Sequence, residues 1–301
     1  MTSFIEKLKN SKNRSLESAR VYNRSAKRLY LLSNEGELPK TTSWLNNKTL
    51  KAKYEKVDLG KRRHLSLAAH IFAKTMGDKN EYWEKRMFKD SSDYAELRQK
   101  NKKTPTEVKK WVDDALQKLR KAATEYKRHI ANKLKQPPSI ANLWLYSQYL
   151  LMKFYSEIQL RNDLGNVSLK DTTGTNYLKK IKGGKYNLIM RDFKASNKIG
   201  EKVIHVSAAL SRAIRTYINY RNKVDLDHDW LLSNSKGKQL SKSAMGKALR
   251  KLTSEKMEKK IGTRMLRIFN ASANAAVITK AEEVANNMLH SAKQSKTYIR
   301  K

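Results

Sequence analysis

The chain has 301 residues, of which 39% are hydrophobic, so two domains of ordinary size with packed cores are feasible. It contains no cysteine, which excludes disulfides, thiolate zinc sites and cysteine nucleophiles, and favours an intracellular protein. The N-terminus lacks the apolar stretch of a signal peptide, and no apolar run approaches the ~20 residues that cross a bilayer. Secretion and membrane association are therefore not expected.

The positive charge is distributed over the whole chain. Lys and Arg total 65 against 28 Asp and Glu, which gives a net charge of +37. Residues 1–135 carry 34 basic and 16 acidic residues, and residues 136–301 carry 31 and 12. A polyanion is the expected partner, because each neutralised phosphate releases condensed counterions. A non-catalytic basic coat protein of the ribosomal type would have the same composition, so both classes stay open on this evidence.

The first half of the chain is predicted to be helical, because apolar residues recur at spacings of three and four. Helices are expected over residues 15–32, 65–76, 81–100 and from 104 to about 135, with a polar loop at 33–42. The last of these begins with a capping box, in which Thr104 caps, Pro105 takes the first helical position and Glu107 closes the box.

A domain boundary is expected at Gln136-Pro137-Pro138-Ser139, which separates a helical domain (1–135) from a second domain (136–301). The apolar segment 140–158 predicts the buried central helix of the second domain. Two β-rich runs, 186–194 and 202–206, predict a hairpin. Later helices are expected to be capped by Ser207, Ser241 and Thr263, with a last helix near 281–289. The predicted fold class is mainly α with a small antiparallel sheet in the second domain.

Most chemical motifs can be rejected. No P-loop pattern exists, and Lys182-Gly183-Gly184-Lys185 is interpreted as a turn before the hairpin. The segment starting at Asp225 resembles a calcium loop, but Trp230 stands where glycine is required and Lys236 where glutamate is required. No histidine pair has HExxH spacing. Neither a metal nor a small-molecule cofactor is expected.

Metal-free phosphoryl transfer makes specific demands on side chains. Arginine offers a planar fork for the non-bridging oxygens, and a lysine can protonate the leaving oxygen. A tyrosine can attack reversibly, because its phenolate is a good leaving group.

Four stretches supply these residue types in the order found in one family. They are Leu160-Arg161-Asn162-Asp163-Leu164, Asp192-Phe193-Lys194-Ala195-Ser196, Arg264-Met265-Leu266-Arg267, and Met288-Leu289-His290-Ser291 followed by Tyr298. In this order they resemble the motifs of the tyrosine recombinases, the integrase-type DNA strand-transfer family. Ser15 to Tyr22 more weakly resembles the opening helix of that family's core-binding domain.

The resemblance implies a two-domain clamp around double-stranded DNA, with a helical DNA-binding domain and a catalytic domain. Tyr298 would be the nucleophile that forms a 3′-phosphotyrosyl link, without ATP. Arg161, Arg267 and His290 would stabilise the transition state. Lys194, with Lys198 as the second choice, would protonate the 5′-oxygen. A set of further DNA or phosphate contacts is expected from Arg264, Lys198 and Arg191.

Three departures from the family pattern leave questions open. Arg264 stands where the family has histidine, so the general base is not identified, and Leu289 replaces a glycine. The sequence ends at Lys301, so the expected homotetramer on DNA must use the Tyr298 segment or other surfaces. A virus or mobile element is the source that the resemblance suggests. Two alternatives remain open. One is a type IB topoisomerase, because Ser295-Lys296-Thr297-Tyr298 resembles the ending of that family. The other is a non-catalytic DNA-binding protein.

Overall fold

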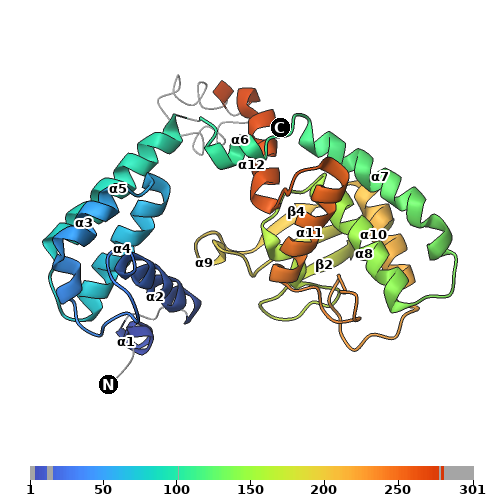
Figure 1. Cartoon of the computed structure of the whole chain (residues 1–301). Helices are drawn as coiled ribbons and strands as arrows, with labels where there is room; N and C mark the ends of the chain where they lie inside the picture. The colour runs from blue at the N-terminus through green and yellow to red at the C-terminus, as the bar shows by residue number, and fades with distance from the viewer. Residues whose placement is uncertain (1–3, 12–15, 101, 278, 281–301) are drawn as a thin grey trace, which may run out of the picture. The chain divides into compact units, whose positions relative to one another are not determined.

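The computed structural model describes residues 4–11, 16–100, 102–277 and 279–280. Within these residues the protein is mainly helical with one small sheet (Figure 1). The chain divides into two compact units, Met1–Thr104 and Pro105–Lys301. This division differs from the boundary expected after residue 135, because the segment 105–135 packs into the core of the second unit.

Helices account for the regular structure of the first unit. The predictions for 15–32, 65–76 and 81–100 are confirmed, with ends shifted by up to six residues, whereas two short helices were not predicted. The elements are α1 (Phe4–Ser11), α2 (Leu16–Tyr30), the 3₁₀ turn η1 (Ser43–Asn46), α3 (Lys48–Glu55), α4 (Leu59–Thr75) and α5 (Glu81–Gln99). Trp83 is fully buried at the centre, where its ring packs edge-on against Tyr54 and its Nε1 donates to the carbonyl of Leu45 at 2.9 Å.

The second unit also consists largely of helices. In the described part of this unit they are α6 (Pro105–Lys109), α7 (Ala115–Leu134), α8 (Ile140–Tyr155), the short α9 (Ser196–Ile199), α10 (Ala208–Arg221), α11 (Lys242–Met257) and α12 (Thr263–Ala273). The single helix expected from 104 to about 135 is wrong, because Asp114 adopts a left-handed backbone conformation (φ 54°) that separates α6 from α7. Trp111 lies in this break and packs edge-on against Phe269 of α12.

The prediction that segment 140–158 forms a buried centre is confirmed by α8. Leu143, Leu150, Leu151 and Phe154 are completely buried between α7, α10, α11 and the sheet. Burial of one such side chain contributes roughly 1.5–3 kcal/mol. The central helix therefore provides a rigid base for the segment that follows it.

The end of α8 is joined to the start of α10 by polar contacts. Lys153 Nζ lies 2.7 Å from Glu157 Oε1, and the Ser207 hydroxyl donates to the same carboxylate. Ser207 also accepts from the amide of Leu210, which confirms it as the cap of α10. Burial alone would raise the pKa of Glu157. The hydrogen bonds from Lys153 and Ser207 oppose burial, and the net result is a pKa below the ordinary value.

The sheet contains four strands in the order β1 (Val167–Ser168), β2 (Asn176–Ile181), β3 (Lys185–Met190) and β4 (Lys202–His205). The predicted hairpin is confirmed as β3 and β4, with Leu188 opposite Ile204. The sheet is mixed and not purely antiparallel, because β1 runs parallel to β2. Lys182-Gly183-Gly184-Lys185 forms the β2–β3 turn, in which both glycines have positive φ.

Ser241 caps α11, as expected, by accepting from the amide of Ala244. Thr263 is not a cap: Gly262 is the N-cap of α12, and Thr263 is the first helical residue. The helix expected near 281–289 lies outside the described residues. Among the described helices, none combines the length and apolar character that crossing a membrane would require.

Candidate active site

A cavity of about 290 Å³ in the second unit lies where the end of α8, the sheet and α12 meet. Two of the arginines predicted for catalysis, Arg161 and Arg267, line it together, although they are more than a hundred residues apart in the sequence. Its full lining consists of Gln159, Leu160, Arg161, Asp163, Met190, Phe193, Lys202, Ile204 and Arg267. The cavity therefore combines cationic groups with an apolar wall.

Arg161 begins a short turn that follows α8, and we call residues 161–166 the Arg161 turn; it contains the 3₁₀ segment η2 (Asn162–Asn166). The hydroxyl of Tyr155, the last residue of α8, donates to the carbonyl of Arg161. Gly165 packs against the backbone that precedes α11, where a Cβ would lie 2.8 Å from the carbonyl oxygen of Leu240 and the amide of Lys242. The backbone of the turn is thus held on both sides.

Three side chains of the Arg161 turn each bond to a different element. Asn162 Oδ1 accepts from the hydroxyl of Thr263 on α12 at 2.9 Å. Asp163 Oδ1 lies 3.6 Å from Nζ of Lys242 at the start of α11. Asn166 Nδ2 donates to Asp192, in the loop between β3 and β4, at 3.4 Å. The turn is therefore bonded to α12, which carries Arg267, and to the loop that carries Lys194.

Arg267, one turn into α12, is half-buried and lies near the positive charges of Arg161 and Arg264. Burial lowers the pKa of its guanidinium, and the positive charges of Arg161 and Arg264 lower it further. Its Nε is buried, and none of the described residues accepts a hydrogen bond from it. A phosphate in the cavity would supply the opposite charge beside Arg161 and Arg267.

Lys194 and Lys198 lie on the loop that joins β3 to β4 and projects from the sheet; this loop contains the short helix α9 (Ser196–Ile199) (Figure 1). Both side chains are exposed, and neither lines the cavity. Phe193, the neighbour of Lys194, does line it. The start of this loop, residues 191–193, which we call its root, therefore reaches the cavity through Phe193, whereas Lys194 and Lys198 do not line it.

Lys202 lines the cavity and was missed by the sequence analysis. It lies on β4 opposite Met190 of β3, which also lines the cavity. Strand alternation could have indicated it, because Lys202 and Ile204 are two residues apart and face the same side. The register of the hairpin, however, is visible only in the structure.

The root of the β3–β4 loop is firmly anchored. Asn176 is completely buried, and its Oδ1 accepts from the amides of Arg191 and Asp192 at 2.8 and 2.7 Å. Its Nδ2 donates to the carbonyl of Asp192 at 2.8 Å. Lys242 Nζ contacts the carboxylate of Asp192 at 2.9 Å. Neither Asn176 nor Lys242 carried a sequence signal that pointed to this role.

The remaining predicted phosphate contacts have carboxylate partners. Arg264 Nη2 lies 3.2 Å from Oε1 of Glu107, while two-thirds of its side chain stays exposed. Arg191 is paired with Asp171 and Glu201, and hydrogen bonds with Glu201 and Asp171 raise its pKa. Contact of Arg191 with DNA would require exchange of these carboxylates for phosphate, and its role stays a prediction.

The predicted nucleophile Tyr298 and the predicted phosphate ligand His290 lie outside the described residues. Their roles stay predictions. Among the described residues, no group of three or more His, Asp or Glu side chains is placed to hold a metal ion.

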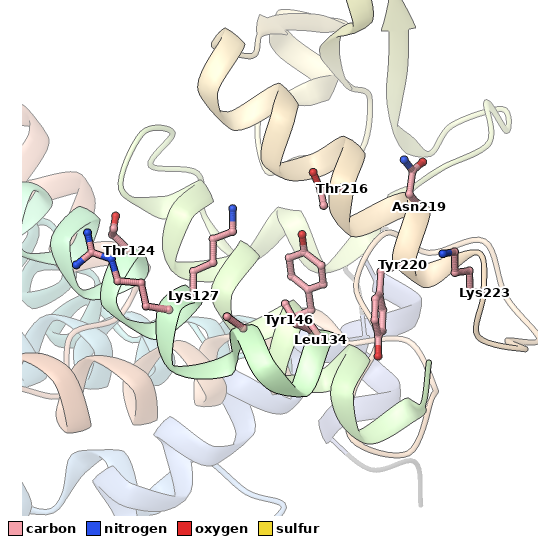
Figure 2. A pocket seen from close by; sticks show the side chains of 10 residues that line it. Thr124, Lys127, Leu134, Tyr146, Thr216, Asn219, Tyr220 and Lys223 are labelled. Atoms are coloured by element: carbon pink, nitrogen blue, oxygen red, sulfur yellow. The ribbon is translucent and has the colours of Figure 1, made fainter. Parts of the chain in front are cut away.

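A second and larger cavity, of about 620 Å³, lies between α7, α8 and α10. Figure 2 shows Lys127, Tyr146, Tyr220 and Lys223 among the side chains that line it. None of the predicted catalytic residues lines it. The smaller cavity is therefore the candidate site, because it is the one where arginines from separate elements converge.

Comparisons with known proteins place the chain in no family. No family model and no curated protein matches its sequence. Among solved structures, the crystal structure of XerA recombinase is similar at a TM-score of 0.36 and 13% sequence identity, over 90% of this chain and 81% of that chain. A likeness at this level demonstrates neither a shared fold nor a shared function.

Proposed function

We propose that this protein is a site-specific DNA recombinase of the tyrosine recombinase type, which cleaves and rejoins DNA strands. The observation that carries the proposal is the pair of arginines, Arg161 and Arg267, that line one cavity from separate elements. Their mutual repulsion favours a bound anion between them. A DNA phosphate is the anion that best fits a chain of net charge +37.

In the proposed reaction, the Tyr298 hydroxyl gives its proton to water, and its oxygen attacks the phosphorus and forms a 3′-phosphotyrosyl bond. The bond from phosphorus to the 5′-oxygen breaks, and Lys194 gives its proton to that oxygen. Arg161, Arg267 and His290 bind the non-bridging oxygens, where negative charge develops. Lys202 adds a further cation at the cavity. The reverse reaction, in which a 5′-hydroxyl attacks the phosphotyrosine, rejoins the strand without ATP.

The protein is proposed to act as a tetramer on two DNA duplexes, because exchange between two sites requires four cleaved strands. A type IB topoisomerase would use the same chemistry as a monomer on one duplex. The two are separated by their products: a recombinase joins two duplexes, whereas a topoisomerase only relaxes a supercoiled plasmid.

The test is capture of a covalent adduct from a pool of randomised 40-base-pair duplexes that contain a nick, since the target sequence is not known. The wild-type protein should retain labelled DNA through denaturing electrophoresis, and Tyr298→Phe should abolish the adduct. Tyr220→Phe is the matched control, because no described residue bonds to the buried hydroxyl of Tyr220. An adduct that survives Tyr298→Phe refutes this nucleophile. Failure of the wild-type protein to form any adduct, while it still binds DNA, refutes the enzyme and favours the non-catalytic DNA-binding protein.

A further inference from the structure

Lys242, the first residue of α11, lies between two carboxylates that belong to different parts of the candidate site. Its Nζ is 2.9 Å from Oδ2 of Asp192 and 3.6 Å from Oδ1 of Asp163. Asp163 lies two residues after Arg161, and Asp192 lies two residues before Lys194. The ammonium group thus connects the Arg161 turn to the start of the loop that carries Lys194, beside the hydrogen bond from Asn166 to Asp192.

The two carboxylates repel each other without this cation. The negative charge of Asp192 contributes to raising the pKa of Asp163, after the larger effect of burial, whereas Lys242 opposes both. The hydrogen bond from Lys242 is also the main cause that lowers the pKa of Asp192. Loss of the ammonium would therefore leave an uncompensated repulsion between the Asp163 and Asp192 carboxylates, at the point where Asn176 anchors the backbone of the loop.

The base of Lys242 is itself held in place. Its backbone amide packs so closely against Gly165 that a Cβ on this glycine would lie 2.8 Å from the amide nitrogen. The preceding residue, Ser241, caps α11. Lys242 is not among the residues that line the cavity with Arg161 and Arg267. Its ammonium group therefore contacts the Arg161 turn and the loop, and does not line the cavity proposed to bind phosphate.

We propose that Lys242 is a positioning residue for DNA cleavage, which holds the loop of Lys194 against the Arg161 turn through Asp192 and Asp163. This inference rests on the proposed function, in which Lys194 protonates the 5′-oxygen as it leaves. A displaced loop would slow that proton transfer while phosphate binding by Arg161 and Arg267 continues.

A substrate with sulfur in place of the bridging 5′-oxygen separates these effects. The tyrosine oxygen still bonds to phosphorus, but the bond that breaks is phosphorus to sulfur, and the thiolate departs without needing a proton from lysine. A defect in proton donation should disappear on this substrate, whereas a defect in folding or in phosphate binding should persist.

The experiment measures single-turnover adduct formation at saturating protein, on a duplex selected by the wild-type enzyme, with oxygen or sulfur at the cleaved position. Lys242→Met is expected to slow cleavage of the oxygen substrate by about 10- to 100-fold, the range for a misplaced catalytic group. On the sulfur substrate its rate should lie within about threefold of the wild-type rate, because the general acid is no longer needed. Lys242→Arg, which keeps the charge, should restore most of the oxygen rate.

Two further variants complete the design. Asp192→Asn weakens the same bridge from its other end and should show the same dependence on the substrate. Lys247→Met is the matched control, since Lys247 is an exposed lysine on the same helix, and both of its rates should remain those of the wild type.

Each outcome is decisive. If Lys242→Met cleaves both substrates at the wild-type rate, or is equally slow on both, Lys242 does not position the general acid. If Lys242→Met does not fold, as judged by thermal denaturation, Asp192→Asn alone decides by the same comparison. Absence of any adduct with the wild-type protein refutes the proposed function instead, and so is distinguishable from failure of this inference.

Discussion

Arg264 Nη2 lies 3.2 Å from Oε1 of Glu107, and the pair joins an exposed guanidinium to a buried carboxylate, with exposed side-chain fractions of 67% and 7%. The contact connects α12 to α6 within the second unit. It also places a negative charge next to the position where the resemblance to tyrosine recombinases leads one to expect a histidine.

Arg264→Ala should lower the free energy of unfolding by about 1–3 kcal/mol, because a buried carboxylate loses a charged hydrogen-bond donor. Chemical denaturation followed by circular dichroism measures the change. Lys170→Ala is the control, since its pair with Asp229 is exposed on both sides and should contribute less than about 1 kcal/mol. Equal effects of the two substitutions would mean that burial of Glu107 does not strengthen its pair with Arg264.

Replacement of either cavity arginine by lysine should impair catalysis although the charge is kept. We expect Arg161→Lys and Arg267→Lys each to reduce the rate of adduct formation by about 10²–10³-fold, because lysine lacks the planar fork that binds two phosphate oxygens. The rate is measured in single turnover, with Arg212→Lys on the exposed face of α10 as the control. Wild-type rates in both cavity variants would show that the cavity does not hold the cleaved phosphate.

Glu157 should make stability dependent on pH in the acidic range. Its folded-state pKa is below its ordinary value of 4.5, so its contribution is complete above that pH and is lost as the pH falls through the folded pKa. Glu157→Gln should therefore be less stable than wild type by about 1 kcal/mol at pH 7, and the difference should shrink below pH 4.5. Urea denaturation at pH values from 3 to 7 checks this; a difference that grows in acid would reverse the sign.

Gly165→Ala should destabilise the second unit by about 1–3 kcal/mol, the usual cost of overpacking. Its Cβ would lie 2.8 Å from backbone atoms of Leu240 and Lys242, which cannot move as a flexible side chain could. Gly262→Ala is the control for steric contact, because the nearest atom to its Cβ, a side-chain carbon of Arg250, is at 3.6 Å; as the N-cap of α12 it should lose less than about 1 kcal/mol. A Gly165→Ala protein as stable as the control would show that the Arg161 turn can shift away from α11.

Local signals predicted several elements well. Ser207 and Ser241 were identified as caps because their hydroxyls satisfy amides three residues later, an interaction confined to one helix turn. Thr263 carries the same signal, but its hydroxyl bonds to Asn162, about a hundred residues away, and Gly262 caps instead. A capping residue and a tertiary donor cannot be distinguished from spacing alone.

The candidate site shows the same limit. Arg161 and Arg267 were found because each lies in a short motif, and the structure brings them to one cavity. Lys202, Asn176 and Lys242 were missed because their roles depend on the strand register and on contacts between distant segments. No pattern within a window of the sequence contains such pairings.

The Arg161 turn determines where this chain can tolerate added length. Within residues 161–166 every polar side chain from Asn162 to Asn166 is engaged by another element, and Gly165 leaves no room for an extra atom. The connection between β1 and β2 is different: residues 171–174 are exposed, and Gly174 has open space around it. A fluorescent reporter or an affinity peptide therefore belongs after Thr173, since an insertion in the Arg161 turn would uncouple Arg161 from both α11 and α12.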